Sequence, residues 1–250
     1  MSSGKGYVDR SYRTLHSGSD LRYFRVGIKE TDLAIGVDND SYDDGLIGLC
    51  EKEARRLRSG LEAYIDIHPE FRSSLAPLDL LPGAPPLVVS MAQAGWQAGV
   101  GPMAAVAGAL AEAVGLTLKK RVKEVIVENG GDIYVDSSKP RLVSVFAGQS
   151  SFSHRIALRI LPGECPLGIC TSSGTVGPSL SFGRADAVVI KGRDTALVDA
   201  VATGAANRIQ TKDDFGLAIE YVQKIPGITG ILAVVGEHLA AWGDIELVPL

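Results

Sequence analysis

The sequence is poor in the residues that most often carry redox or transition-metal chemistry. It has three cysteines (Cys50, Cys165 and Cys170) and no CxxC pair, so the cysteines cannot all pair within the chain. Its four histidines are scattered without a partner at ligand spacing, and none is assigned a role. This composition predicts a reduced, cytoplasmic protein.

Long apolar runs and a strong charge of one sign are also missing. No stretch approaches the roughly 20 apolar residues that a membrane-spanning helix needs. The first residues, MSSGKGYVDRSYR, carry charge but no apolar core, so no signal peptide is expected. A formal net charge of −4 gives no reason to expect nucleic acid. We therefore expect neither a membrane nor a nucleic acid as a partner.

The composition that remains is that of an ordinary globular protein. The 250 residues, 46% hydrophobic and 22% charged, suit one large domain or two small ones with a substantial core. Residues 1–20 are polar and contain glycine and serine. We expect a loosely held arm there and a single domain over residues 21–250.

Apolar periodicity predicts helices interleaved with many short strands. The predicted helices cover residues 43–66, 101–118, 194–209 and 213–223. Predicted strands cover residues 21–29, 33–38, 87–93, a run ending at 129, 133–135, 142–146, 156–160, 167–170, 187–190, 228–235, 239–242 and 245–248. The first two strands read as an antiparallel hairpin. Long helices mixed with consecutive strands indicate an α+β fold with a mainly antiparallel sheet.

The stretch from Gly95 to Val135 is the one around which we expect the chain to be organised. Its predicted helix, 101–118, carries an apolar stripe and a second stripe of very small residues, at which another backbone can approach closely. The small residues are Ala104, Gly108, Ala111 and Gly115. Gly99 and Gly101 precede the helix and leave its first amides uncovered, which suits an anionic group. The alternative is a helix that serves packing alone.

A second stretch, Thr195 to Asn207, places three oxygen-bearing side chains on one helical face. Asp199, Thr203 and Asn207 recur every four residues among alanines, valines and a glycine. A carboxylate with a hydroxyl suits Mg²⁺, which takes few protein ligands and completes its shell with water and phosphate. The alternative is that Thr203 bonds back to the helix and Asp199 faces water.

Two loops are candidates for ligand contact. Asn129-Gly130-Gly131-Asp132 joins two β runs, and an Asn-Gly pair favours a tight type I′ turn, although two glycines also let a ligand lie against bare backbone. Thr171-Ser172-Ser173-Gly174 offers amides and hydroxyls to a phosphate, with a solvated loop as the alternative. Cys170 just before it reads as a buried small hydrophobe.

Together these segments resemble the ApbE family, the FAD:protein FMN transferases, and more closely its short cytoplasmic relatives of unknown function. Gly101–Val135 resembles a family stretch of helix, strand and Gly-Gly-Asp turn. Residues 171–174 resemble its T-S-G segment, and Asp199-Ala200-Val201-Ala202-Thr203 matches its D-A-x-A-T motif. The similarity extends weakly over residues 20 to about 240.

The resemblance implies an α+β fold of two related halves, with antiparallel sheets backed by helices around a central cleft. It also implies Mg²⁺ held by Asp199, Thr203 and the backbone carbonyl of Ala104, with FAD cut at its pyrophosphate and FMN passed to a partner protein. The glycine backbone at 99–101 and 130–131, with Asn129, would position the ligand.

Further candidates for contact with the ligand come from the loops. They are Asp132, for a polar contact, Arg184, for pairing with phosphate, and Ser172, Ser173 and Gly174.

Two departures in the motifs separate this chain from the family pattern, and the export signal that many family enzymes carry is not expected here either. The family's Lys-Gly in the central helix reads Ala107-Gly108, and its His-x-x-Asp-Pro segment is replaced by residues 181–186. The lost lysine and histidine are groups that would hold FAD and move a proton.

Three hypotheses follow from the motifs and the departures. The first is a Mg²⁺-dependent enzyme acting on a flavin or another nucleotide pyrophosphate. The second is a binding protein for a nucleotide, a flavin or a small anion that has lost the transferase activity. The third is a structural domain whose small-residue helices pack subunits together. The sequence leaves the substrate, a protein acceptor and a homodimer open.

Overall fold

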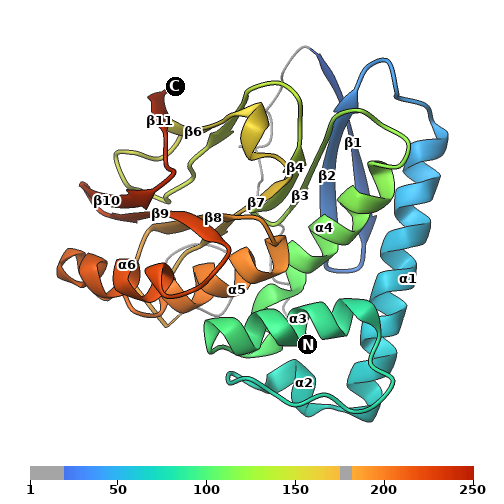
Figure 1. Ribbon diagram of the computed structural model, residues 1–250, viewed down its shortest axis with the longest axis horizontal. Coiled ribbons are helices and arrows are strands. Elements are labelled where there is room, and N and C mark those ends of the chain that lie inside the picture. The colour runs from blue at the N-terminus through green and yellow to red at the C-terminus, as the bar shows by residue number, and fades with distance from the viewer. Residues whose placement is uncertain (1–19, 175–181) are drawn as a thin grey trace, which may run out of the picture.

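The computed structural model describes residues 20–174 and 182–250. The arm predicted over residues 1–20 lies outside this range except for Asp20, and so does the segment 175–181 that follows Gly174. The described residues form one large sheet, one small sheet and a set of helices (Figure 1).

The large sheet has eight strands and is antiparallel throughout. Its order is β1-β2-β3-β4-β7-β8-β9-β10, so the chain leaves the sheet between β4 and β7 and returns beside β4. The strands are β1 (Leu21–Ile28), β2 (Thr31–Asp38), β3 (Val125–Asn129), β4 (Asp132–Asp136), β7 (Leu167–Ser172), β8 (Ala187–Gly192), β9 (Ile228–Val235) and β10 (His238–Gly243). The predicted hairpin of residues 21–38 is confirmed, with its turn at Lys29 and Glu30.

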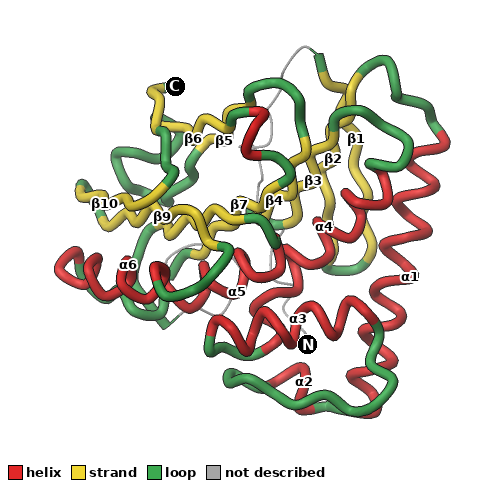
Figure 2. Tube along the Cα trace, viewed as in Figure 1, coloured by secondary structure: helices red, strands yellow, loops and turns green. Residues whose placement is uncertain are grey.

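A small antiparallel sheet and the helices cover opposite faces of the large sheet (Figure 2). The small sheet contains β5 (Arg141–Ser144), β6 (Ile156–Ile160) and β11 (Leu247–Pro249), in the order β11-β6-β5. The helices are α1 (Gly45–Ile67), α2 (Glu70–Ser73), α3 (Pro86–Ala98), α4 (Val106–Leu118), α5 (Thr195–Ala206) and α6 (Phe215–Gln223), with short 3-10 turns η2 (Pro102–Ala105), η3 (Pro162–Glu164) and η4 (Lys212–Asp214).

The alternation of side chains along the central strands produces two hydrophobic cores. In β4, Tyr134 packs into the core under the helices, whereas Ile133 and Val135 pack into the core under the small sheet. In β7, Cys170 points to the helix side and Ile169 to the other side. Both faces of these strands are covered, which explains why their sequences are continuous apolar runs.

One predicted element is wrong. Residues 87–93, read as a strand, belong to α3, whose buried residues Leu87, Val88, Met91 and Ala92 follow helical spacing. Pro86 occupies the first helical turn, and Gly99 ends the helix in a left-handed conformation with φ of 66°. Within the described residues no single helix is long and apolar enough to cross a membrane, and only the pair Pro86–Ala98 and Pro102–Leu118, bent by 107°, meets that test together.

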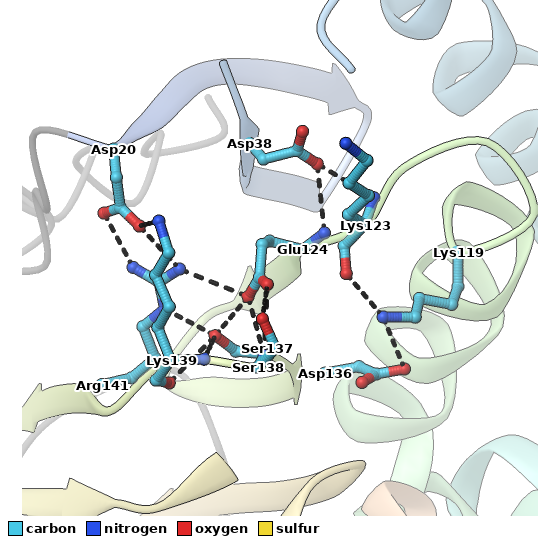
Figure 3. A network of polar contacts seen from close by, with 10 residues as sticks. All are labelled: Asp20, Asp38, Lys119, Lys123, Glu124, Asp136, Ser137, Ser138, Lys139 and Arg141. Carbon is cyan, nitrogen blue, oxygen red and sulfur yellow. Dashed lines mark hydrogen bonds and ion pairs between the residues drawn. The ribbon is translucent and has the colours of Figure 1, made fainter. Parts of the chain in front are cut away.

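A polar network joins the ends of four strands (Figure 3). Arg141, at the start of β5, donates two hydrogen bonds to the Asp20 carboxylate, at 2.9 and 3.1 Å. Its Nε donates to Ser137 Oγ at 2.8 Å, and the hydroxyls of Ser137 and Ser138 donate to Glu124. Asp20 precedes β1, Glu124 precedes β3, and the two serines follow β4. The network therefore fixes the start of β1 against the β4–β5 connection.

A second polar contact fastens the small sheet to the large one. Lys191 of β8 is buried, forms an ion pair with Glu164 of η3 and donates to the backbone oxygen of Asp244 at 2.8 Å. A buried ammonium needs such partners because an unpaired charge is costly in the interior. The contact therefore holds the connections around the small sheet against the central strands.

Candidate functional site

The site forms where α5 crosses the first turn of α4. A Cβ added to Gly108 would clash with the backbone oxygen of Thr195 and lie 2.8 Å from the Cβ of Asp199. The prediction that a stripe of small residues lets another backbone approach α4 is therefore confirmed at Gly108. At Gly115 the approaching group is the ring of Tyr134 rather than a backbone.

Asp199 points into this crossing and not into water. Its Oδ2 accepts a hydrogen bond from the Gly108 amide at 2.8 Å, and only 9% of the residue is exposed. Burial, the largest influence, raises the pKa of Asp199, while the amides of Gly108 and Ala107 act in the opposite direction. The alternative in which Asp199 faces solvent is wrong. The Gly108 amide, in the first turn of α4, is therefore satisfied by a carboxylate of the same chain.

A second buried acid lies beside Asp199. Asp132, at the start of β4, has its pKa held well above its usual range by burial first and then by the negative charge of Asp199. The neighbouring Cys170 thiol and Thr171 amide act in the opposite direction and lower that pKa. Asp132 Oδ1 is nevertheless buried with no hydrogen-bond partner in the part of the chain that the structure describes. The two acids resist being ionised together in this place, and a proton or a cation would relieve their mutual repulsion.

Cys170 contributes packing rather than reactivity. Its side chain is fully buried, its Sγ lies 3.6 Å from the Thr195 backbone oxygen, and burial holds the pKa of its thiol well above the usual range. A nucleophilic cysteine needs the thiolate form, which this environment disfavours. The interpretation of Cys170 as a buried small hydrophobe is confirmed.

The turn predicted at Asn129-Gly130-Gly131-Asp132 is confirmed and lies against the same helix start. Gly130 and Gly131 have φ angles of 70° and 108°, and Asn129 pairs with Asp132 across the hairpin. The Asn129 side chain donates to the backbone oxygen of Ala107 at 3.1 Å. The hairpin therefore packs its polar end on α4. Contact of these residues with a ligand stays a prediction.

Gly99 and Gly101, which precede η2, occupy positions where the backbone conformation or close packing requires glycine. Gly99 ends α3 with a positive φ, and a Cβ on Gly101 would clash with the backbone oxygen of Ser74. The Ala104 amide donates to the Gly101 oxygen at 3.1 Å within η2, an element that contacts α5. Roles for Gly99 and Gly101 in ligand binding and for the Ala104 carbonyl as a metal ligand stay predictions.

Thr203 and Asn207 follow Asp199 along α5. Thr203 is half-buried, and its backbone oxygen accepts from the Asn207 amide at 3.0 Å. Asn207 follows the last residue of α5, and its side-chain oxygen accepts from the Phe182 amide at 2.8 Å. The Asn207 side chain thus holds the segment that begins at residue 182.

The T-S-S-G segment and the Arg184 segment lie together. The Gly174 amide donates to the Ala185 oxygen at 3.0 Å, and the Ser173 hydroxyl reaches the same oxygen at 3.5 Å. Ser172 ends β7, and its Oγ is buried without a hydrogen-bond partner among the described residues. Arg184 is exposed. Their contacts with phosphate stay predictions.

Sequence reasoning missed one residue of this site, Glu112 of α4. Its Oε2 accepts a hydrogen bond at 3.2 Å from the amide of Thr195, the first residue of α5. The signal was present, because Glu112 is the only charged residue in the helix VAGALAEAVGLTL. A lone charge in an apolar helix that packs on both sides calls for a buried partner.

The donor set that the resemblance implies would suit a hard cation. No group of three or more histidines, cysteines or acidic residues in the described ranges could hold a metal. The set implied by the resemblance instead contains one carboxylate, one hydroxyl and one backbone carbonyl, and oxygen ligands of this kind suit Mg²⁺. The unpartnered Asp132 oxygen and the raised pKa values of the two acids fit a cation at this place.

Comparison with known proteins gives a consistent family match. A family model described as "AbpE bacteria" matches residues 13–223. A UPF0280 protein of Methanosarcina barkeri is 39% identical over 224 residues, which is 88% of this chain and 86% of that protein. A UPF0280 protein of Methanospirillum hungatei is 46% identical over 192 residues, covering 76% and 77% of the two chains.

Solved structures with the same fold include flavin transferases. The flavinyl transferase ApbE of Pseudomonas stutzeri, in its apo form, aligns with a TM-score of 0.57 at 12% identity, covering 89% of this chain and 94% of that one. Flavin transferase ApbE from Vibrio cholerae aligns with a TM-score of 0.57 at 12% identity, covering 90% and 97%. The α+β, ApbE-like fold predicted from the sequence is confirmed.

Proposed function

This chain belongs to the UPF0280 family and has the fold of the ApbE flavin transferases, and from that premise we propose that it is a Mg²⁺-dependent enzyme acting on a flavin or another nucleotide pyrophosphate. A related function is what the structural likeness supports. The substrate class and the metal are our proposal, and they depend on the chemistry of the α4–α5 crossing.

One observation carries the proposal: the buried Asp199 carboxylate on the Gly108 amide, with Asp132 beside it. Two acids in a poorly solvated place repel each other, and each is easier to ionise when a cation is near. Asp199, Thr203 and the Ala104 carbonyl would hold Mg²⁺. When bound, the metal would neutralise charge on the phosphates as the pyrophosphate bond breaks.

The protein's own contribution is to position the ligand. The Asn129–Asp132 turn lies against the start of α4, so the hairpin backbone and the first turn of that helix face one region. Gly130 has open space at its Cβ position, so a ligand could lie directly against this backbone. Ser172 and Arg184 would add polar contacts to phosphate. Transfer of FMN to a protein acceptor, a cytoplasmic location and a homodimer are further parts of the proposal.

A binding protein without turnover is the second candidate. Ala107 stands beside Gly108 where the ApbE pattern has a lysine, and the His-x-x-Asp-Pro segment is absent. No lysine or histidine contacts Asp199 in the hydrogen bonds of the described chain. Such a protein would keep the metal and the nucleotide while lacking the group that moves a proton.

The test is incubation of the purified protein with FAD and MgCl₂, following AMP and FMN by chromatography and the melting temperature in parallel. We expect Mg²⁺-dependent AMP release that falls by about 10²–10³-fold in Asp199→Ala, the loss typical when a charge-stabilising group is removed. Asp66→Ala, at an exposed aspartate of α1, is the matched control and should keep full activity.

The outcomes separate the candidates. A Mg²⁺-dependent rise in melting temperature without AMP release supports the binding protein. If the wild type shows neither AMP release nor a Mg²⁺-dependent rise in melting temperature, both candidates are contradicted. Thr203→Val, which removes only the hydroxyl, serves as a second variant if Asp199→Ala does not fold, and we expect it to raise the Mg²⁺ concentration required.

A further inference from the structure

The helices α4 and α5 cap each other's first turns. On α4, the Gly108 amide donates to Asp199 of α5 at 2.8 Å. On α5, the Thr195 amide donates to Glu112 of α4 at 3.2 Å. The first amides of a helix have no partner inside their own helix, so each carboxylate satisfies a group that would otherwise be buried and unpaired.

The two hydrogen bonds form a ladder of two rungs. Gly108 and Glu112 are four residues apart on α4, and Thr195 and Asp199 are four residues apart on α5, so the rungs are one helical turn apart on both helices. The later residue of one helix faces the earlier residue of the other. Fixing the Glu112 rung therefore fixes the register at which Asp199 meets Gly108.

We propose that Glu112 is a positioning residue: its carboxylate holds the first turn of α5 against α4 and thereby places Asp199 on the Gly108 amide. The consequence for metal binding depends on the proposed function, whereas the consequence for the Gly108 hydrogen bond depends only on the ladder. Asp194, which caps α5 by accepting from the Leu197 amide at 2.9 Å, lacks any such link to α4 among the described contacts.

The environment of Glu112 fits this role. Thr195 is fully buried, so its amide needs the partner that Glu112 supplies. Burial, with a contribution from the charge of Asp194, raises the pKa of Glu112 to about 7, which shows that placing a carboxyl here has an electrostatic cost. A glutamate that only improved solubility would lie on the exposed side of the helix.

The experiment compares Glu112→Gln, Glu112→Asp and Glu112→Ala by amide hydrogen exchange at Gly108 and by calorimetric titration with MgCl₂. The Gln oxygen accepts the same hydrogen bond at the same length, so Glu112→Gln should keep wild-type Gly108 protection and Mg²⁺ affinity. The Asp side chain is too short to reach, so Glu112→Asp and Glu112→Ala should each lose about tenfold in both measurements, the size expected for one hydrogen bond. Glu51→Ala, at an exposed glutamate of α1, is the control.

A purely structural role predicts a different result. If Glu112→Asp melts at a lower temperature yet keeps Gly108 protection and Mg²⁺ affinity, the positioning role is overturned. If Glu112→Ala does not fold, the Gln and Asp variants still test the positioning role. Equal Gly108 protection and Mg²⁺ affinity in those two variants overturn it. If the wild type does not bind Mg²⁺, the proposed function fails, and Gly108 exchange alone decides the role of Glu112.

Discussion

At the scale of single residues, Gly108 is the position that lets the site exist. Its missing side chain allows the Thr195 backbone and the Asp199 side chain to lie directly on α4. Helix interiors usually disfavour glycine, so glycine here has a cost that close packing offsets. The Asp199 hydrogen bond depends on that approach.

Gly108→Ala should therefore destabilise the protein and weaken the Asp199 contact together. The added methyl group would clash with the Thr195 oxygen, and overpacking of this kind costs about 1–3 kcal/mol. The control is Gly48→Ala in α1, where the new Cβ would have no atom within 4 Å. That change should stabilise by roughly 0.5–1 kcal/mol through helix propensity. Urea unfolding of both variants checks this, and equal effects would contradict it.

Single-residue prediction from the sequence succeeded where a local pattern carried the information. Helical spacing identified the face that holds Asp199, and the stripe of small residues identified α4 as a close-contact helix. The partner of Asp199 could not be predicted, because Gly108 lies 91 positions away in the chain. Glu112 could have been identified as the only charged residue of its helix, but its partner Thr195 could not, because Thr195 comes 83 positions later.

At the scale of elements, the network of Asp20, Glu124 and Arg141 joins the ends of β1, β3 and β5, none of which pairs directly with another of the three. Arg141 and Glu124 are buried, and Asp20 has a 31% exposed side chain. The Arg141 hydrogen bonds are the largest influence on Asp20 and lower its pKa from 3.8 to about 2. Burial is the largest single influence on Glu124 and acts to raise its pKa, but the hydrogen bonds of Ser137, Ser138 and Arg141 together lower it.

This network should make stability depend on acid in a defined range. A carboxyl with a lowered pKa in the folded state stabilises the fold above its unfolded pKa, and the contribution disappears as pH falls through the folded value. For Asp20 the range is pH 3.8 down to about 2. Wild type should lose on the order of 1 kcal/mol more than Asp20→Asn across it, after allowance for solvent screening.

Urea unfolding at several pH values measures that difference. Asp40→Asn, at an exposed position after β2, should follow the wild-type curve. If Asp20→Asn loses stability with acid as steeply as the wild type does, the Asp20–Arg141 contact contributes nothing to it.

Most elements were predictable from periodicity. Residues 87–93 were not, because periodicity over a short apolar segment does not separate a strand from a buried helix. Residues 87–93 contain Leu87, Val88 and Val89, and a short apolar run with β-branched residues reads equally as a strand or as part of a buried helix. The deciding information lay further along, at Ala94, Gly95 and Ala98, which continue the buried helical face.

At the scale of the whole molecule, one layer of helices and one small sheet enclose a central antiparallel sheet, and the candidate site lies on the helix side. The order of the strands was not predictable from local patterns, because β4 pairs with β7 although β5 and β6, which belong to the small sheet, lie between them in the chain. The D-A-x-A-T and Gly-Gly-Asp motifs predicted the overall fold through their resemblance to the ApbE family, whereas periodicity predicted only the separate elements. The site exists only once both halves of the chain have folded together.

The most direct test of the account is where a divalent cation binds. A crystal soaked with MnCl₂ and ADP, with Mn²⁺ in place of Mg²⁺, would give an anomalous-scattering peak. We predict that the peak lies between the Asp199 carboxylate and the Thr203 hydroxyl, touches the ADP phosphates and disappears in Asp199→Ala crystals. A peak bound to ADP elsewhere, or one that persists in Asp199→Ala, would contradict the account.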